Sequence, residues 1–329
     1  MRTIRQRRLS GLAVLLFMAG AASAQVCQTV ADMGPETRTA LETTAQRYFK
    51  MVGQGDTASL RQNSMPSLAA GFAGVEAAVK ENQASFAGAS ATVRPPFVLQ
   101  EEGTAPLERG EFLCGIFTNT GQTSNSAVFM IPNLPPGTYA VVILDVTTSN
   151  GPYALTFVLQ QQGVDWKLAG FYVKASQAGG HDGAWFADKA REFKSRGETR
   201  TAWLYAQKAR ELLVPVPFMS TLATDKLYDE FEKTKPEDFP PTQVQAGTKT
   251  YQLSSLFLLP VGQELDLIVK YQSADVSNTA QTFQDNLSLI KALVAKYPEL
   301  RDGFDAVVTR AVEPSGRDFG SMLPMKEIN

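Results

Sequence analysis

The single histidine of the chain, His181, is where any histidine-based catalysis would have to begin. It stands beside Asp182, and an adjacent imidazole and carboxylate could act as an acid–base pair. The two residues directly precede a predicted helix, where Asp182 can cap the helix and the helix dipole favours a neutral imidazole. We therefore expect both residues to be structural rather than catalytic.

A serine-to-lysine spacing is the second candidate for catalysis. Ser288 and Lys291 match the S-x-x-K pattern of serine acyl-enzymes, but the S-D-N and K-T-G elements of those enzymes are absent from the sequence. Nucleophile elbows, nucleotide-binding glycine motifs and calcium-loop patterns are absent as well. One histidine and two cysteines are too few for a zinc-finger site. We predict no catalytic residue, no cofactor and no metal site.

Residues 1–24 have the pattern of a secretory signal peptide. Four arginines precede a short apolar run at 12–20, and an A-x-A cleavage site ends at Ala24. The run is too short for a membrane anchor, and the residues after Arg8 match the twin-arginine signal poorly. Removing four of the 31 basic residues leaves 27 against 33 acidic residues, a net charge of −6. The sequence thus predicts an exported protein, periplasmic or secreted, that does not bind nucleic acid and has no transmembrane segment in its mature chain.

The two cysteines, Cys27 and Cys114, can pair in an oxidising compartment. The alternative is a pair of free thiols, with Cys114 filling the core as a small apolar group. Lipid attachment would require Cys27 to be the first mature residue, and Val26 precedes it. We expect a disulfide and no lipid anchor.

A chain of 329 residues, of which 44% are hydrophobic, is long enough for about two folded domains. Residues 25–177 form the first α+β domain. Apolar periodicity predicts helices near 35–52 and 68–79, followed by strands near 91, at 111–117 and at 127–131, and by an antiparallel meander at 138–146, 152–161 and 165–174. In the last strand, simple alternation places Trp166, Leu168, Gly170 and Tyr172 on one face.

This order of elements, and the closing sequence from Asp165 to Tyr172, resemble the NTF2-like cone fold. The resemblance covers about 35–175 and implies a curled sheet that wraps the helices and often leaves a pocket. Phe157, Trp166 and Tyr172 are the residues that we expect to line it. A β-sandwich similar to prealbumin is the alternative, suggested by the residues from Leu134 onwards, but the preceding helices argue against it.

Residues 178–242 are predicted to form a helical hairpin and a proline-rich linker. The helices span 182–195 and 198–213, with small residues at spacings like those of one tetratricopeptide unit. No second copy of the unit follows, so we expect a hairpin that docks on a neighbouring domain. The charged stretch at 225–238 is assigned to the linker.

A second resemblance rests on three segments of this hairpin: HDGAWF from His181, AWLY from Ala202 and LLVPVPFMS from Leu212. Together they resemble an uncharacterised family of exported bacterial proteins. This family carries no activity to transfer, so His181, Asp182, Trp185 and Trp203 form a motif of unknown role.

Residues 243–329 are predicted to form a small β-β-α-β domain. Strands at 249–259 and 264–272 precede an apolar-striped helix at 279–297, and a strand at 304–312 follows. We expect the remaining residues, up to Asn329, to be frayed or to form a short additional strand.

The expected function follows from export without a converging catalytic set. We predict a non-enzymatic protein that binds an unidentified small molecule or interacts with an envelope protein. The first alternative is an acid–base enzyme of isomerase or dehydratase type, or a small-molecule binder, that uses the cone pocket. It would draw its carboxylate from Asp145, Glu101 or Glu111. The second alternative is a scaffold that binds a protein through the hairpin face with Trp185, Trp203 and Tyr205.

Overall fold

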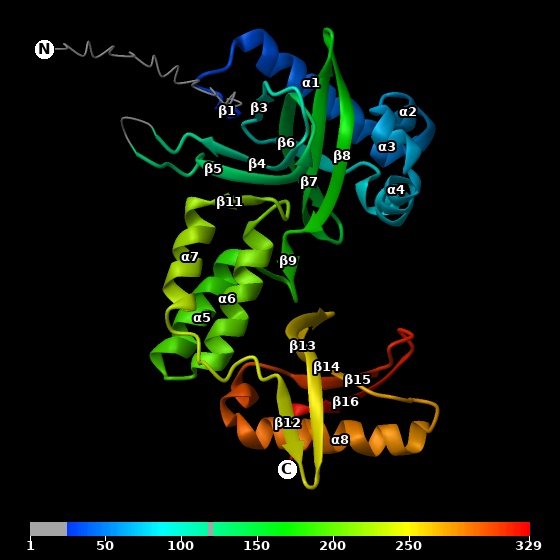
Figure 1. Ribbon diagram of the computed structural model, residues 1–329, viewed down its shortest axis with the longest axis vertical. Helices are drawn as coiled ribbons and strands as arrows, with labels where there is room; N and C mark the ends of the chain where they lie inside the picture. Colours follow the sequence, from blue (N-terminus) through cyan, green and yellow to red (C-terminus); the bar gives the residue numbers. More distant parts are fainter. Residues whose placement is uncertain (1–24, 118–120) are drawn as a thin grey trace, which may run out of the picture.

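The structure is a computed structural model that describes residues 25–117 and 121–329 (Figure 1). The predicted signal peptide at 1–24 lies outside the described residues. The fold is mixed α+β, with largely antiparallel sheets. Three hydrophobic core clusters hold it together, and they are described in turn below.

A six-stranded antiparallel sheet forms the centre of the first domain (Figure 1). Its order is β1-β3-β6-β7-β8, and β2 pairs with β6 beside β3. The strands are β1 (Gln25–Gln28), β2 (Ser90–Val93), β3 (Phe97–Glu101), β6 (Gly137–Thr148), β7 (Gly151–Gln162) and β8 (Asp165–Ala175). The β6–β8 register confirms the predicted meander.

Helices cover one face of this sheet, and their apolar side chains pack against it. They are α1 (Pro35–Gln54), α2 (Thr57–Gln62), α3 (Pro66–Ala70) and α4 (Ala73–Phe86). The helix predicted near 68–79 is two helices, because the chain turns at Gly71. Leu41, Tyr48 and Val79 are fully buried against Leu155 and Phe157 of the sheet. The core between helices and sheet leaves these side chains no exposed surface.

The opposite face of the sheet packs on a second, three-stranded sheet of order β11-β5-β4. Its strands are β4 (Leu107–Cys114), β5 (Ala127–Leu134) and β11 (Met219–Thr221). Phe112 and Phe129 fill the space between the sheets with no exposed surface. Strand β4 ends at Cys114 rather than continuing to Phe117, because Gly115 takes a left-handed φ of 62°.

A β-bulge in β8 overturns the predicted alternation of that strand. Val158 of β7 pairs with Gly170, whereas the next residue, Leu159, pairs with Leu168. The extra residue reverses the side-chain direction, so Trp166 and Leu168 face the helices while Gly170 and Tyr172 face the other way. A period-2 pattern cannot reveal such an insertion.

The predicted hairpin is present as α5 (Gly183–Ser195) and α6 (Thr199–Leu213), preceded by the short strands β9 (Gln177–Ala178) and β10 (His181–Asp182). The first part of the charged stretch assigned to the linker, up to Glu232, lies in a further helix, α7 (Leu222–Glu232), and the proline-containing residues after it are not helical. Leu227 and Phe231 bury one side of α7, and Thr221 and Thr224 form a capping box at its start. The charges of this segment therefore belong to the solvent side of a helix.

The C-terminal domain is a five-stranded sheet of order β12-β13-β14-β15-β16, backed by α8 (Figure 1). The elements are β12 (Gln243–Ala246), β13 (Lys249–Val261), β14 (Glu264–Gln272), α8 (Thr279–Lys296), β15 (Ala306–Val312) and β16 (Asp318–Pro324), with 3-10 turns at Pro298–Asp302 and Met325–Glu327. The predicted β-β-α-β core is present, and β12 and β16 extend it. The hairpin helices and this sheet contribute to one hydrophobic core cluster.

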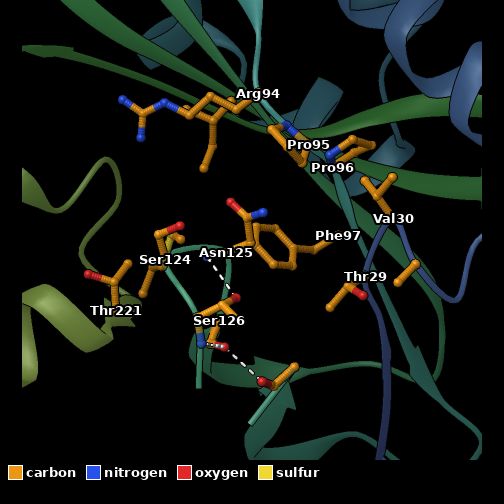
Figure 2. A pocket seen from close by; sticks show the side chains of 15 residues that line it. Thr29, Val30, Arg94, Pro95, Pro96, Phe97, Ser124, Asn125, Ser126 and Thr221 are labelled. Carbon is orange, nitrogen blue, oxygen red and sulfur yellow. Dashed lines mark hydrogen bonds between the residues drawn. The ribbon is translucent and has the colours of Figure 1, made fainter. Parts of the chain in front are cut away.

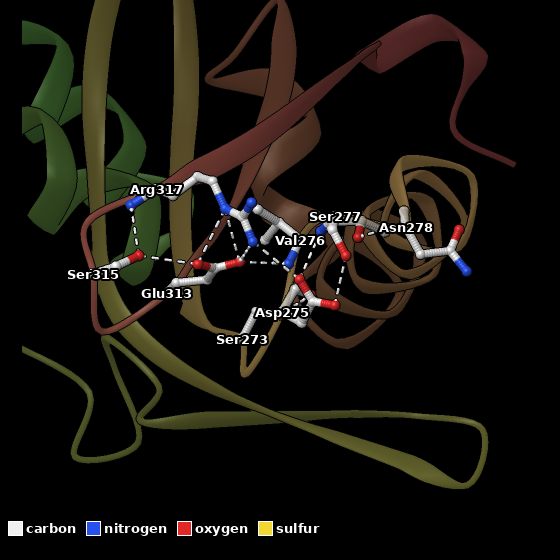
Figure 3. Close-up of polar contacts among 9 residues, drawn as sticks. Ser273, Asp275, Val276, Ser277, Asn278, Glu313, Ser315 and Arg317 are labelled. Carbon is white, nitrogen blue, oxygen red and sulfur yellow. Dashed lines mark hydrogen bonds and ion pairs between the residues drawn. The ribbon is translucent and has the colours of Figure 1, made fainter.

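A polar cluster joins two loops at one end of this sheet (Figure 3). Glu313 accepts hydrogen bonds from Arg317 and from the backbone N–H of Val276, at 2.6 and 2.7 Å. Asp275 accepts from the Ser277 hydroxyl and also pairs with Arg317. Arg317 first, and then the Val276 N–H, lower the pKa of Glu313, and the bonds from Ser277 lower that of Asp275.

We expect Glu313→Gln to reduce the dependence of stability on acid pH. A carboxylate whose folded pKa is depressed stabilises the fold above its unfolded pKa, near 4, and this contribution is lost as pH falls through the folded value. Urea unfolding between about pH 7 and pH 3 should show the variant less stable at neutral pH and converging on the wild type in acid. Glu81→Gln, at an exposed position of α4, is the control. If the unfolding free energies of the wild type and Glu313→Gln changed in parallel with pH, this would contradict the lowered pKa of Glu313.

Candidate functional site

The three residues expected to line a cone pocket do not line a common one. Phe157 has no exposed surface and packs against Tyr48, with ring centroids 5.7 Å apart. Trp166 is 7% exposed and lies in the same helix-facing core. Tyr172 faces the opposite side of the sheet because of the bulge in β8.

Tyr172 lines a groove on that opposite side, here called the β5–β8 groove. The groove has a volume of about 620 Å³ and is bounded by β5, β8 and the segment that leads into β11. Its lining residues are Arg109, Met130, Ile131, Pro132, Asn133, Leu134, Pro135, Tyr139, Val158, Ala169, Gly170, Tyr172, Pro217 and Phe218. Such a volume is typical of sites for small molecules.

Two aromatic rings and a glycine shape the groove. Tyr172 meets Phe218 edge to face, with centroids 5.4 Å apart, and it keeps 37% of its surface exposed. Gly170 forms part of the floor, where a Cβ atom would lie 3.2 Å from both the Tyr172 ring and the Val158 side chain. Met130, 42% exposed, adds a flexible apolar wall. The surface thus offers uncovered apolar area beside an aromatic edge.

The electrostatics of the groove are dominated by one cation. Burial raises the pKa of both Tyr139 and Tyr172, so both phenols are neutral at physiological pH. Tyr139 donates its hydroxyl hydrogen to the Pro135 carbonyl, 2.9 Å away. Arg109 is the one charged lining residue, and its guanidinium donates to the Met130 sulfur at 3.2 Å. Within the described residues it has no ion pair to a carboxylate.

A second cavity, of about 390 Å³, lies beside the residues that follow the two cysteines (Figure 2). Its polar groups largely satisfy one another. Ser126 accepts from the Thr123 N–H and donates to the Gly115 carbonyl, at 2.8 and 2.7 Å. Figure 2 shows the Arg94 guanidinium pointing away from Ser126, and Asp145 holds it in a bidentate ion pair. The one charged side chain of this cavity is therefore already paired, whereas that of the β5–β8 groove is not within the described residues.

The hairpin motif divides into two parts in the structure. The Asp182 carboxylate accepts from the Trp185 N–H at 2.9 Å and so caps α5, as the sequence predicts. His181 stacks on the Trp185 ring, with centroids 3.7 Å apart and planes 8° from parallel. Trp203 lies on α6 and meets the Phe239 ring edge to face. His181, Asp182 and Trp185 form one contact set, and Trp203 belongs to another.

The hairpin aromatics are not gathered on an open face. Tyr205 is 4% exposed and donates to the Gly303 carbonyl at 2.6 Å, across to the C-terminal domain. Trp185 and Trp203 are both partly buried against the shared core. Lys235 lies over the Trp203 ring at 5.1 Å. These contacts tie the hairpin to its neighbours.

The carboxylates considered for acid–base catalysis are dispersed. Asp145 is exposed and ion-paired with Arg94. Glu101 is 2% exposed and accepts from the Gly103 N–H, while its second carboxylate oxygen is buried with no partner among the described residues. Glu111 is exposed on β4. None of the three lines the β5–β8 groove.

Several groove residues could not be found from the sequence. Arg109 lies on β4 and Met130 on β5, two strands with no motif. They line the groove together with Tyr172 only because the three-stranded sheet packs on the face of the six-stranded sheet opposite the helices. Phe218 lies in the LLVPVPFMS segment, one of the three on which the second resemblance rests. That segment is the only sequence signal that could have pointed to Phe218.

The disulfide between Cys27 and Cys114 is present, with Cα atoms 5.1 Å apart. No helix in the described part of the chain has the length and apolar character needed to cross a membrane. Residues 25–117 and 121–329 contain no cluster of three or more side chains suited to a metal ion. Comparisons with protein-family models, curated proteins and solved structures find no match to this chain.

Proposed function

We propose that this chain is an exported, non-enzymatic binding protein that holds an apolar molecule with an anionic group in the β5–β8 groove. The observation that carries the proposal is the combination of exposed apolar walls with an arginine, Arg109, that has no ion pair among the described residues. Burial of the apolar part of such a ligand supplies binding energy, and Arg109 can bind a carboxylate through its paired N–H groups. The disulfide supports export, since such bonds persist in oxidising compartments.

The resemblance to the NTF2-like fold is retained as part of this proposal. Its support is the placement of α1 and α4 against the antiparallel meander β6–β8. The ligand site, however, is proposed on the outer side of that sheet, because the helix-facing side is filled. The resemblance of the hairpin segments to exported bacterial proteins accords with the same compartment.

Two probes that differ only in charge test the proposal: 2-naphthoate and its neutral amide. We expect both to bind the mature protein and the carboxylate to bind more tightly. Gly170→Val should weaken both at least tenfold because the new side chain fills the groove. Arg109→Gln should weaken naphthoate about tenfold and leave the amide unchanged. Fluorescence titration measures the dissociation constant of each probe for the wild type and for each variant.

The control substitution is Val164→Ala, at an exposed turn on the other side of the sheet. This substitution should leave the dissociation constants of naphthoate and of its amide unchanged. Failure of the wild type to bind either probe, or equal binding to wild type and Gly170→Val, would refute the groove as the ligand site.

A further inference from the structure

One wall of the β5–β8 groove presents a thioether sulfur to solvent, that of Met130. Met130 lies on β5 and is 42% exposed. Its backbone N–H donates to the Phe218 carbonyl at 2.8 Å, which holds this part of β5 against the segment that leads into β11. Met322 of β16, 55% exposed, is the other exposed methionine in the described part of the chain, and it does not line the groove. The two sulfurs therefore have similar access to solvent and different surroundings.

A methionine sulfur in contact with solvent can be oxidised by a peroxide. A lone pair of the sulfur attacks one oxygen of hydrogen peroxide, the O–O bond breaks and a sulfur–oxygen bond forms. The other oxygen leaves with both protons as water, so the sulfur is oxidised to the sulfoxide and the peroxide is reduced. Both cysteines of the chain are joined in the disulfide, so no free thiol competes for the oxidant. Exposed methionines are therefore the first targets.

The cation beside its sulfur distinguishes Met130 from Met322. Arg109 lies on the neighbouring strand β4, diagonally across from Met130 in the strand register. Its Nη2 donates to the Met130 Sδ at 3.2 Å. A thioether sulfur is only a weak acceptor, whereas oxidation turns the side chain into a polar one with an oxygen on the sulfur. Oxidation thus places a strong acceptor where the guanidinium now has a weak one.

Nη2 is also the nitrogen that a carboxylate ligand would use. An arginine binds a carboxylate through two parallel N–H groups, and Nη2 belongs to both such pairs, one with Nε and one with Nη1. Arg94 and Arg317 hold their carboxylate partners in this chain through Nε and Nη2. A sulfoxide oxygen on Nη2 of Arg109 competes with a bound carboxylate, and its partial negative charge repels the ligand. A neutral ligand is subject to neither effect.

We propose that Met130 is an oxidation site that regulates the groove, because its sulfoxide engages Arg109 and lowers the affinity for anionic ligands. This inference rests on the proposed function, since it assigns a regulation to the same groove. The oxidants are hydrogen peroxide and organic hydroperoxides. The groove prefers an anion while Met130 is reduced and loses that preference when Met130 is oxidised.

Limited treatment of the mature chain with hydrogen peroxide tests the proposal, with peptide mass spectrometry and titration of 2-naphthoate and its amide as the measurements. Met130 and Met322 should each gain one oxygen before the buried Met65 and Met219, which are 9% and 8% exposed. The oxidised protein should bind naphthoate about tenfold more weakly and the amide within about twofold of its earlier affinity. Retained affinity for the amide also shows that the groove is still folded.

Three variants separate the contribution of Met130 from other effects of the oxidant. Met322→Leu should respond to peroxide as the wild type does. Met130→Leu should keep, after peroxide, whatever affinities it had before the treatment. In Arg109→Gln, peroxide should no longer change the ratio of the two affinities, because the competition requires the guanidinium.

The untreated wild type shows which proposal has failed, should one fail. If it binds neither probe, the proposed function is wrong, and the regulation with it. If it prefers naphthoate both before and after complete oxidation of Met130, the regulation alone is wrong. Equal losses for both probes, a response that persists in Met130→Leu, or a Met130 that stays reduced while Met322 is converted would likewise overturn the regulation.

Discussion

Replacement of both cysteines, Cys27→Ser with Cys114→Ser, is expected to lower the free energy of unfolding by about 4–5 kcal/mol. The cysteines are separated by 87 positions, and closing a loop of this length restricts the unfolded chain by an amount of that order. The bond also joins β1, in the six-stranded sheet, to β4, in the three-stranded sheet. Its loss should therefore loosen the interface between the two sheets as well as the N-terminal strand.

Urea unfolding of the wild type and the double variant, with and without a phosphine reductant, measures this effect. The reductant should destabilise the wild type to the level of the double variant and have no effect on the variant itself. A loss below about 1 kcal/mol would show that β1 and β4 remain associated without the bond. The groove should retain affinity for naphthoate wherever the variant stays folded, since neither cysteine lines it.

The elements with strong local signals were predictable from the sequence. The helix at Pro35–Gln54 has an apolar stripe and ends at Gly55, whose left-handed φ of 69° the helix end requires. The meander β6–β8 has clear alternation and turn residues between its strands. Asp182 was identified as a helix cap because its position before the apolar periodicity is a local property.

Apart from the disulfide, features that depend on tertiary contacts were not predictable. The bulge in β8 places Tyr172 on the face of the sheet opposite to the predicted one. An inserted residue of this kind is visible only in the pairing of β7 with β8, which the sequence does not show. The charged segment that forms α7 was assigned to a linker because its burial rests on only a few apolar residues, among them Leu227 and Phe231. The β5–β8 groove combines residues from five strands and two loops, so no window of the sequence contains its pattern.

Phe157→Ala is expected to cost about 3–5 kcal/mol of unfolding free energy, the range observed when a buried aromatic ring is replaced by alanine. Phe157 has no exposed surface, and its ring centroid lies 5.7 Å from that of Tyr48 and 5.8 Å from that of Phe171. Tyr48 donates to the backbone carbonyls of Asn63 and Trp166. A cavity at Phe157 would therefore weaken both the ring packing and the position of Tyr48.

Tyr172→Ala is the matched control for this change, because it removes an aromatic ring from the neighbouring strand of the same sheet. Tyr172 is 37% exposed, so its loss should cost about 1 kcal/mol or less and should weaken naphthoate binding. The two substitutions thus separate packing from recognition on opposite faces of one sheet. If Phe157 instead lined an open pocket, its alanine variant would be nearly as stable as the wild type and would bind ligands differently. A small loss of stability together with altered naphthoate affinity would therefore return the ligand site to the helix-facing side.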